Sequence, residues 1–221
     1  MVPYTTVFPK PLMPIGGKPV LELVLRRLQR QGVRRATLAV GYLEELIRAF
    51  FGDGTKVGIE LDYFREETPL GTVGAVSMLE DLPDPCLLMN GDVLTTLDIG
   101  EMTRVHEERG AVMTVATQAR EVAIDYGVLE TNGGGDITAY REKPVLKYVV
   151  SAGVNLLGAE ARKALRRGER CDVPTLVARL VERGSRVATY PCDAYWRDIG
   201  RRDDYEAANA EVPSLMAEFG L

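Results

Sequence analysis

The 221-residue chain has little of several residue types on which catalytic and metal sites are often built. Its single histidine, His106, lies among charged residues of a predicted helix, so we expect a surface histidine and neither histidine catalysis nor a histidine-rich metal site. Three scattered cysteines, Cys86, Cys171 and Cys192, make neither a disulfide framework nor a zinc pattern. Such sparse cysteine usage is typical of a reducing, cytoplasmic compartment.

Long apolar runs and basic clusters are also missing. No stretch approaches the roughly 18 apolar residues of a membrane span, and no charged segment followed by an apolar run opens the chain, so neither a membrane span nor a signal peptide is expected. The net charge is −5 and no basic stripe stands out, so nucleic acid is not an expected partner. The hydrophobic content of 46% is sufficient for one domain with a substantial core.

The order of predicted elements is that of an α/β protein. In the first half, strands and helices alternate, which predicts βαβ units and a parallel sheet, whereas the second half has several consecutive strands. We therefore expect a single domain over residues 1–221 with two lobes. Helices are predicted at 19–31, 43–51, 71–80, 101–109, 159–167, 173–183 and 202–211, and strands at 36–40, 59–64, 86–89, 111–117, 126–130, 137–141, 149–157 and 186–190.

The strand predicted at 86–89 stops at Asn90-Gly91-Asp92. Ligands of open α/β sheets bind outside the carboxyl ends of the strands, where Asp92 would lie. A carboxylate there suits a hard cation such as Mg²⁺ when phosphates and water complete the coordination shell. The same residues fit an Asn-Gly turn with a solvated aspartate, so this stretch alone leaves both interpretations open.

Two other stretches have features of anion sites. Residues 1–19 are rich in proline and glycine, and such a stiff, irregular loop can hold Lys10 against an anion at little further entropic cost. Gly71 and Gly74 bracket the start of a predicted helix, where backbone N–H groups attract anions. Composition alone favours a packed connector with solvated lysines for the first stretch, and glycines like those of the second often serve only packing.

Six short motifs are distributed in order along the whole chain: Phe8-Pro9-Lys10-Pro11-Leu12-Met13-Pro14-Ile15, Pro69-Leu70-Gly71-Thr72-Val73-Gly74-Ala75, Asn90-Gly91-Asp92, Tyr126-Gly127-Val128-Leu129, Arg141-Glu142-Lys143-Pro144 and Trp196-Arg197-Asp198-Ile199-Gly200. In this order they resemble the sugar-1-phosphate nucleotidyltransferases, including the mannose-, heptose- and glucose-1-phosphate enzymes. The resemblance implies a Rossmann-like, mixed and mostly parallel sheet flanked by helices. It also implies a nucleotide-binding lobe at about 1–118 and a sugar-binding lobe at about 119–221.

The resemblance assigns the nucleotide and metal sites. Lys10 would neutralise the triphosphate, and Gly71 and Thr72 would contact the nucleotide. Asp92 and Asp198 would hold Mg²⁺, although Asp198 also fits a helix cap. The implied partners are a nucleoside triphosphate and a sugar 1-phosphate, and a homo-oligomer is left open.

The sugar-phosphate site is assigned in the same way. Lys143 would hold the phosphate and Glu142 would accept hydrogen bonds from sugar hydroxyls, although the two also fit a weak surface ion pair. Asn155 stands where relatives often have an aromatic residue, so the identity of the sugar is left open. The implied set is Gly127, Glu142, Lys143, Ser151 and Asn155.

The resemblance places Glu66 and Glu67 where the family contacts the base. An ionised carboxylate accepts hydrogen bonds and donates none. Guanine offers two adjacent N–H donors on its Watson–Crick edge, whereas uracil and thymine alternate acceptor, donor and acceptor. A carboxylate therefore favours GTP over UTP or dTTP.

The strand and glycine-rich loop with which the family begins are not found in this chain, which opens at Met1-Val2-Pro3-Tyr4-Thr5. Loss of that strand would leave a gap in the sheet with unpaired backbone groups. Either the true start lies upstream, or the chain is a shortened relative without activity; the intact site residues favour the first. A binding or regulatory paralogue is the second hypothesis, and a glycosyltransferase is less favoured because the motif is Asn-Gly-Asp rather than Asp-x-Asp.

Overall fold

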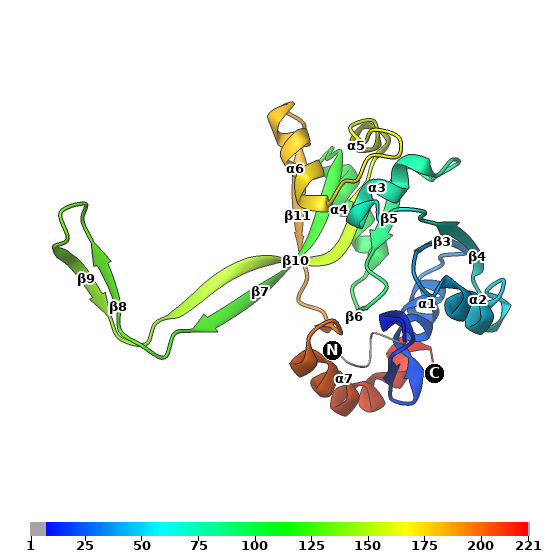
Figure 1. Ribbon diagram of the computed structural model, residues 1–221, viewed down its shortest axis with the longest axis horizontal. Coiled ribbons are helices and arrows are strands. Elements are labelled where there is room, and N and C mark those ends of the chain that lie inside the picture. Colours follow the sequence, from blue (N-terminus) through cyan, green and yellow to red (C-terminus); the bar gives the residue numbers. More distant parts are fainter. Residues whose placement is uncertain (1–7, 221) are drawn as a thin grey trace.

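The computed structural model describes residues 8–220, so the part of the expected N-terminal loop at 1–7 lies outside the described residues. Figure 1 shows a body of helices and strands from which one long two-stranded arm, residues 118–150, projects. The helices are α1 (Val20–Arg30), α2 (Glu44–Phe51), α3 (Gly71–Gly74), α4 (Ile99–Glu108), α5 (Ala159–Arg162), α6 (Val173–Glu182) and α7 (Arg202–Leu215), with 3₁₀ turns η2 (Lys10–Leu12), η3 (Thr55–Val57), η4 (Ala75–Met78) and η5 (Met216–Phe219).

The strands are distributed over several sheets. They are β1 (Pro14–Ile15), β2 (Lys18–Pro19), β3 (Arg35–Val40), β4 (Glu60–Arg65), β5 (Cys86–Met89), β6 (Val93–Thr95), β7 (Met113–Ala123), β8 (Val128–Thr131), β9 (Ile137–Arg141), β10 (Val145–Leu157), β11 (Val187–Pro191) and β12 (Trp196–Asp198). The largest sheet has the order β11-β7-β10-β5, in which β11 and β7 are parallel and the other pairs antiparallel. The parallel pair β3-β4 stands apart from it. The α/β class with a mixed sheet is thereby confirmed.

Between these two sheets, β3 and β5 each have an edge without a strand. Within residues 8–220, β3 pairs only with β4 and β5 pairs only with β10. A gap of this kind in the sheet was predicted from the sequence. Backbone N–H and C=O groups along these edges lack the ladder partners that a further strand would supply.

The core has three parts. One joins α1 to α2, the β3-β4 pair and the C-terminal η5, with Leu23, Phe51 and Phe219 almost fully buried. The other two lie on opposite faces of the large sheet: α5 and α6 cover the face with Leu157, and α4 covers the face with Leu156. This separation of neighbours follows from the two-residue period of side chains along a strand.

The expectation for His106 was wrong. Its side chain is only 5% exposed, and its Nδ1 lies 2.8 Å from the Thr114 hydroxyl on β7. The charged residues next to His106 in the sequence suggested an exposed position. His106 nevertheless shares its helix face with the fully buried Met102, four residues earlier. Burial lowers the pKa of His106, so the ring is held neutral in the fold.

Several element boundaries also differ from those expected. The helix predicted over 71–80 is α helical only to Gly74 and continues as a 3₁₀ turn to Met78, and α5 ends at Arg162 rather than at 167. Strand β6 was not predicted, because three residues are too short for a periodic pattern. The division into nucleotide-binding and sugar-binding lobes stays a prediction.

Candidate active site

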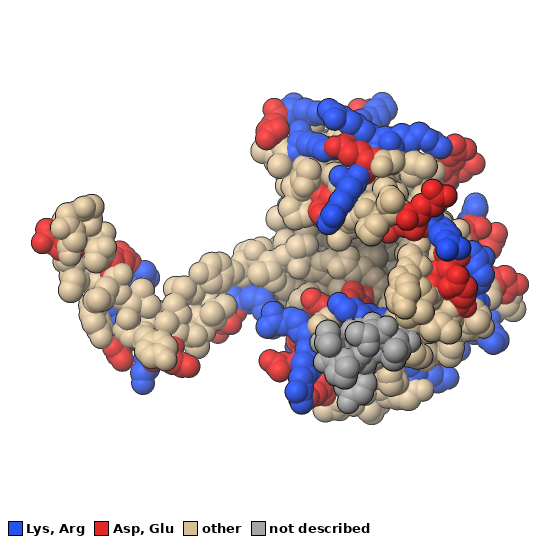
Figure 2. Space-filling model, viewed as in Figure 1, with Lys and Arg blue, Asp and Glu red and all other residues tan. Residues whose placement is uncertain are grey.

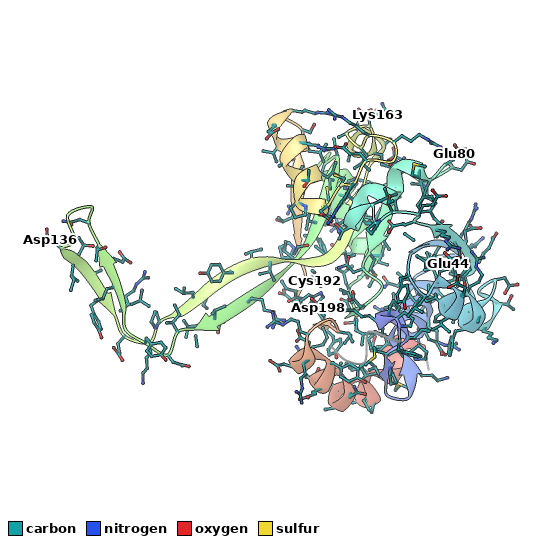
Figure 3. The ribbon with its side chains drawn as sticks, viewed as in Figure 1. Glu44, Glu80, Asp136, Lys163, Cys192 and Asp198 are labelled. Atoms are coloured by element: carbon teal, nitrogen blue, oxygen red, sulfur yellow. The ribbon has the colours of Figure 1, made fainter. Side chains whose placement is uncertain are left out.

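Three of the predicted site residues converge on Gly200. A β-carbon built on Gly200 would lie 3.0 Å from Asp198 Oδ1, 3.6 Å from Asp92 Oδ2 and 3.7 Å from Lys10 Nζ. Two carboxylates and one ammonium group, from three separate parts of the chain, therefore surround one point. Figure 3 places Asp198 in the body, between the large sheet and α7.

Strand pairing explains why the two carboxylates meet. Strands β6 and β12 are antiparallel, with Asp198 opposite Val93, so Asp198 arrives beside the residue that precedes Val93. The Ile199 N–H donates to the Asp92 carbonyl at 3.0 Å, and the Gly200 N–H donates to Asp198 Oδ1 at 2.9 Å. These two bonds fix the backbone on both sides of the site.

Lys10 reaches the same point from the N-terminal segment. It begins the 3₁₀ turn η2, where the Met13 N–H donates to the Lys10 carbonyl at 2.9 Å. A β-carbon built on Gly91 would meet Pro11 at 3.9 Å, so this segment lies against the Asn90-Gly91-Asp92 turn. The stiff loop expected from its prolines thus holds a lysine beside two carboxylates.

The electrostatics of the site suit a cation. Burial, and then the nearby Asp198, raise the pKa of Asp92, and Lys10 opposes that shift. A positive charge placed between the two carboxylates would stabilise their ionised forms. In residues 8–220 no cluster of three or more His, Cys, Asp or Glu side chains forms a metal site, so the chain offers these two carboxylates. Two carboxylates with phosphates and water are the usual Mg²⁺ set, and the site fits this ion.

Glu66 and Glu67 line an open pocket at the ends of β3 and β4. The Glu66 N–H donates to the Val40 carbonyl at 2.9 Å, which places both glutamates just past the carboxyl ends of this parallel pair. The pocket is also lined by Gly41 and Tyr42, and Tyr42 is 83% exposed. Burial raises the pKa of Glu66, against a hydrogen bond from the Leu70 backbone. The location is that of ligand sites in open α/β sheets.

Gly71 packs against, and Thr72 hydrogen-bonds to, the segment at Cys171 and Asp172. The Thr72 N–H donates to Asp172 Oδ1 at 2.9 Å, and the next two N–H groups both donate to the Cys171 carbonyl at 3.1 Å. A β-carbon on Gly71, where φ is +79°, would lie 2.6 Å from that carbonyl oxygen. Glycine is required here for packing, and nucleotide contact by these residues stays a prediction.

Ser151 and Asn155 lie on β10 on either side of a bulge. The bulge residue Gly153, at φ +71°, accepts a hydrogen bond from the Asn90 N–H at 3.0 Å, so the segment lies against the turn that carries Asp92. Asn155 is 2% exposed, and its Oδ1 has no hydrogen-bond partner among residues 8–220. Ser151 is exposed and can reach a ligand, whereas Asn155 would contact one only from within the core.

The remaining sugar-phosphate residues lie on the arm. A β-carbon on Gly127 would be 2.2 Å from the Tyr140 hydroxyl oxygen and 3.1 Å from Glu142 Oε2, so these residues pack together. The Tyr140 hydroxyl donates to Glu142 at 3.0 Å, and Lys143 has a left-handed backbone with φ +43°. Figure 3 shows the arm, whose tip carries Asp136, extending away from Asp198. The structure therefore groups Gly127, Glu142 and Lys143 with one another but not with Lys10 and the two aspartates.

Sequence reasoning missed the contacts that support Asp198. Arg120 at the base of the arm lies 3.3 Å from Asp204 on α7 and stacks over the Trp196 ring at 5.1 Å. Arg197 forms a two-pronged ion pair with Glu211, with distances of 3.0 and 2.7 Å. The only signal in the sequence was the position of Arg197 within the Trp196-Arg197-Asp198 motif, because partners on α7 cannot be read from a pattern.

Comparison with known proteins identifies a family and several relatives of this chain. A family model described as nucleotidyl transferase matches residues 1–214. The chain is 28% identical to a UTP–glucose-1-phosphate uridylyltransferase of Synechocystis, covering 99% of this chain and 64% of the relative, and 27% identical to a mannose-1-phosphate guanylyltransferase of Mycobacterium tuberculosis, covering 95% and 60%. It thus spans less than two thirds of the length of these two relatives. A D-glycero-alpha-D-manno-heptose 1-phosphate guanylyltransferase of Aneurinibacillus thermoaerophilus is 28% identical, with 92% and 89% covered.

Solved structures share the fold. HddC from Yersinia pseudotuberculosis complexed with GMP-PN superposes with a TM-score of 0.71 at 22% identity, covering 93% of this chain and 90% of HddC. A putative glucose-1-phosphate thymidylyltransferase from Bacillus anthracis also gives a TM-score of 0.71, at 20% identity, covering 95% of this chain and 89% of that one. Together with the relatives, they confirm the fold class and the resemblance inferred from the six motifs.

Proposed function

Because this chain belongs to the nucleotidyl transferase family, we propose that it transfers a nucleotidyl group from a nucleoside triphosphate to a sugar 1-phosphate. An oxygen of the sugar phosphate attacks the α-phosphorus, a new P–O bond forms, and the bond to pyrophosphate breaks. Such a reaction requires alignment and charge neutralisation more than covalent chemistry by the protein. The products are a nucleotide sugar and pyrophosphate.

The observation that carries the proposal is the convergence of Lys10, Asp92 and Asp198 around Gly200. The Lys10 ammonium group would neutralise phosphate oxygens. The two aspartates would hold Mg²⁺, which when bound neutralises phosphate charge and orients the reacting groups. The Gly200 N–H holds the Asp198 carboxylate, and the Ile199 N–H fixes the backbone of Asp92, before substrate arrives.

GTP is the nucleotide that the base pocket favours. Glu66 and Glu67 line an open pocket at the strand ends, and a carboxylate matches the adjacent N–H donors of guanine. Two of the relatives are guanylyltransferases by name, whereas a third is a uridylyltransferase, so the glutamates rather than the relatives support this choice. Competition among GTP, UTP and dTTP in one assay tests it, and a preference for UTP or dTTP would contradict it.

The cysteines bear on the compartment of the protein. All three cysteines, Cys86, Cys171 and Cys192, are buried and free, which supports a reducing cytoplasm. No helix in residues 8–220 is long and apolar enough to cross a membrane.

Ser151 is the proposed sugar contact that already lies beside the Asn90-Gly91-Asp92 turn.

Pyrophosphate release with GTP and a panel of sugar 1-phosphates tests the activity. Asp92→Asn and Asp198→Asn should each reduce the rate by about 10²-fold or more, because both ligands of the ion are required. Asp203→Asn is the matched control, since this exposed aspartate lies on the first turn of α7 and outside the site. Unchanged turnover in the two site variants would contradict the proposal.

A nucleotide-sugar-binding protein without turnover is the second candidate. One observation favours it: the N–H groups at the start of α3 donate to Cys171 and Asp172, so they do not form an anion cradle. Calorimetry separates the two candidates. Binding of a nucleotide sugar without pyrophosphate release from any triphosphate would favour the second.

A further inference from the structure

Many apolar side chains are exposed on the arm, residues 118–150. It consists of the outer parts of β7 and β10 and the β8-β9 hairpin, and Figure 2 shows its stem as largely uncharged surface. Tyr126 is 78% exposed and Val149 is 74% exposed. The full set of large apolar residues exposed on the arm is Val122, Tyr126, Leu129, Ile137, Tyr140, Val145, Tyr148 and Val149.

These side chains form a surface large enough for an interface. At roughly 200 Å² for a whole tyrosine side chain, the three tyrosines alone expose on the order of 400 Å². A standard interface buries about 800 Å² per partner, and the five aliphatic residues add to the tyrosine area. A two-stranded ribbon is marginally stable by itself in water, so covering this surface would stabilise the arm.

The apolar surface of the arm is not covered by the body of the same copy. Its stem is a regular antiparallel ladder, in which Gln118–Ala123 pair with Val145–Val150, and at about 3.4 Å per residue it reaches roughly 20 Å from the sheet. The hydrogen bonds and ion pairs of residues 124–144 all stay within the arm, among them Arg141–Glu130 and Tyr140–Glu142. The stem ladder thus carries the apolar side chains of the arm away from the body of the same copy.

The base of the arm is also fixed in direction. Arg120 is held between Asp204 and the Trp196 ring, and Asp204 is itself almost buried on α7. The contact joins the stem to the strand that ends at Asp198. The arm therefore leaves the body at a defined angle beside the site.

The site in one copy is incomplete without an arm. Lys10, Asp92 and Asp198 lie in the body, whereas Glu142 and Lys143, the expected sugar-phosphate contacts, lie on the arm. Lys143 has no ion-pair partner among residues 8–220. The body site has two carboxylates that suit a cation, with the Lys10 ammonium group beside them. A phosphate held by Lys143 would be attracted by Lys10 and by a cation between the two carboxylates.

We propose that two copies of this chain associate by exchanging arms, so that each arm lies against the body of the other copy and completes its site. The inference rests on the proposed function for the role of Glu142 and Lys143, but the association itself does not. Exchange of identical elements about a two-fold axis lets both arms bury their apolar side chains with the stem ladder intact. Each active site is then composite, with the metal ligands from one copy and the sugar-phosphate contacts from the other.

Molar mass in solution is the first test, because it does not depend on activity. The monomer is 24.3 kDa, so light scattering during size exclusion should give about 49 kDa for the wild type. The double substitution Tyr148→Ser with Val149→Ser should give the monomer mass. Val181→Ser is the matched control, because Val181 is 60% exposed on α6, and it should remain dimeric. Circular dichroism melting checks that the body of each variant is folded.

A monomeric wild type, or a dimer that the double substitution leaves intact, would overturn the proposal. If the arm substitutions unfold the stem, Tyr126→Ser alone, outside the ladder, gives the same test of the apolar surface. It should weaken the dimer by at least about tenfold in dissociation constant if the tyrosine is buried there.

Mixing two inactive variants tests the exchange of arms. Asp198→Asn has an intact arm, and Glu142→Ala with Lys143→Ala has an intact body. In a randomly reassociated mixture, half of the dimers are mixed and each has one intact composite site, so about a quarter of the wild-type rate should return. A dimer without recovery, in a protein whose wild type is active, would refute the exchange. A dimer whose wild type is inactive would refute the proposed function and leave the mass test to decide the association.

Discussion

Replacing Gly200 with alanine would put a methyl group at the point on which the three charged groups converge. The added carbon would lie 3.0 Å from Asp198 Oδ1, 3.6 Å from Asp92 Oδ2 and 3.7 Å from Lys10 Nζ. The Gly200 backbone is outside the left-handed region, so alanine is compatible with its conformation. The substitution therefore changes the space between the carboxylates while keeping every charge.

The expected effect on stability is small and the effect on activity is large. A glycine-to-alanine change at a compatible position stabilises by about 0.4–1 kcal/mol, and crowding against the Asp198 carboxylate costs about 1–3 kcal/mol. The net loss is about 1 kcal/mol, which for a chain of this size lowers the melting temperature by about 2–4 °C. Moving a carboxylate or a phosphate by about 1 Å can reduce the rate by about 10²-fold.

Pyrophosphate release and thermal melting, measured on the same preparation, separate these effects. Gly100→Ala is the matched control, since its β-carbon would lie 3.3 Å from a carboxylate oxygen of Asp98, at the start of α4 and outside the site. We expect Gly100→Ala to keep both activity and stability. A fully active Gly200→Ala would refute the reasoning, because the space beside Gly200 would then not be used by metal or phosphate.

Three other predictions concern charge and base recognition. In metal-free protein, Asp92→Asn should raise the melting temperature at neutral pH, because burial raises the pKa of Asp92 and its ionised carboxylate therefore destabilises the fold. The gain should vanish as the pH falls toward about 3.9, where the unfolded aspartate is protonated too. No gain in melts with chelator would contradict the burial of this charge. The lowered pKa of His106 makes the wild type lose stability as the pH falls below about 6.5, where the unfolded histidine takes up a proton. His106→Gln, which can still bond Thr114, should show a flatter pH profile in urea unfolding, and an equally steep profile would refute the assignment. Glu66→Gln should shift the ratio of kcat/KM for GTP over UTP by about tenfold toward UTP, and an unchanged ratio would remove Glu66 from base recognition.

The sequence predicted the parts of this protein that depend on local pattern. Strand β5 was predicted over 86–89 and lies at Cys86–Met89, and Asn90-Gly91-Asp92 follows it directly, as expected. The ordered motifs added the prediction that Lys10 and Asp198 belong to the same site, and the structure brings both near Asp92. Their convergence on Gly200 could be expected from the resemblance but not from spacing, because β6 and β12 are three-residue strands that carry no period.

Long-range packing explains what the sequence did not predict. His106 is buried because of its register with Met102 on α4, and its charged neighbours in sequence hid that face. The start of α3 was predicted as an anion site, yet its N–H groups from Thr72 to Gly74 donate to Cys171 and Asp172, about a hundred residues later. The direction of the arm depends on Arg120 meeting α7, which no local pattern encodes.

A crystal grown with GTP and Mn²⁺ in place of Mg²⁺ tests the central claim most directly. Two aspartates beside Lys10 should hold the cation, so an anomalous peak is expected between the Asp92 and Asp198 carboxylates, with the triphosphate on the side of Lys10. The peak should be lost in Asp198→Asn. A peak elsewhere, or nucleotide bound with no metal between these two carboxylates, would contradict the account.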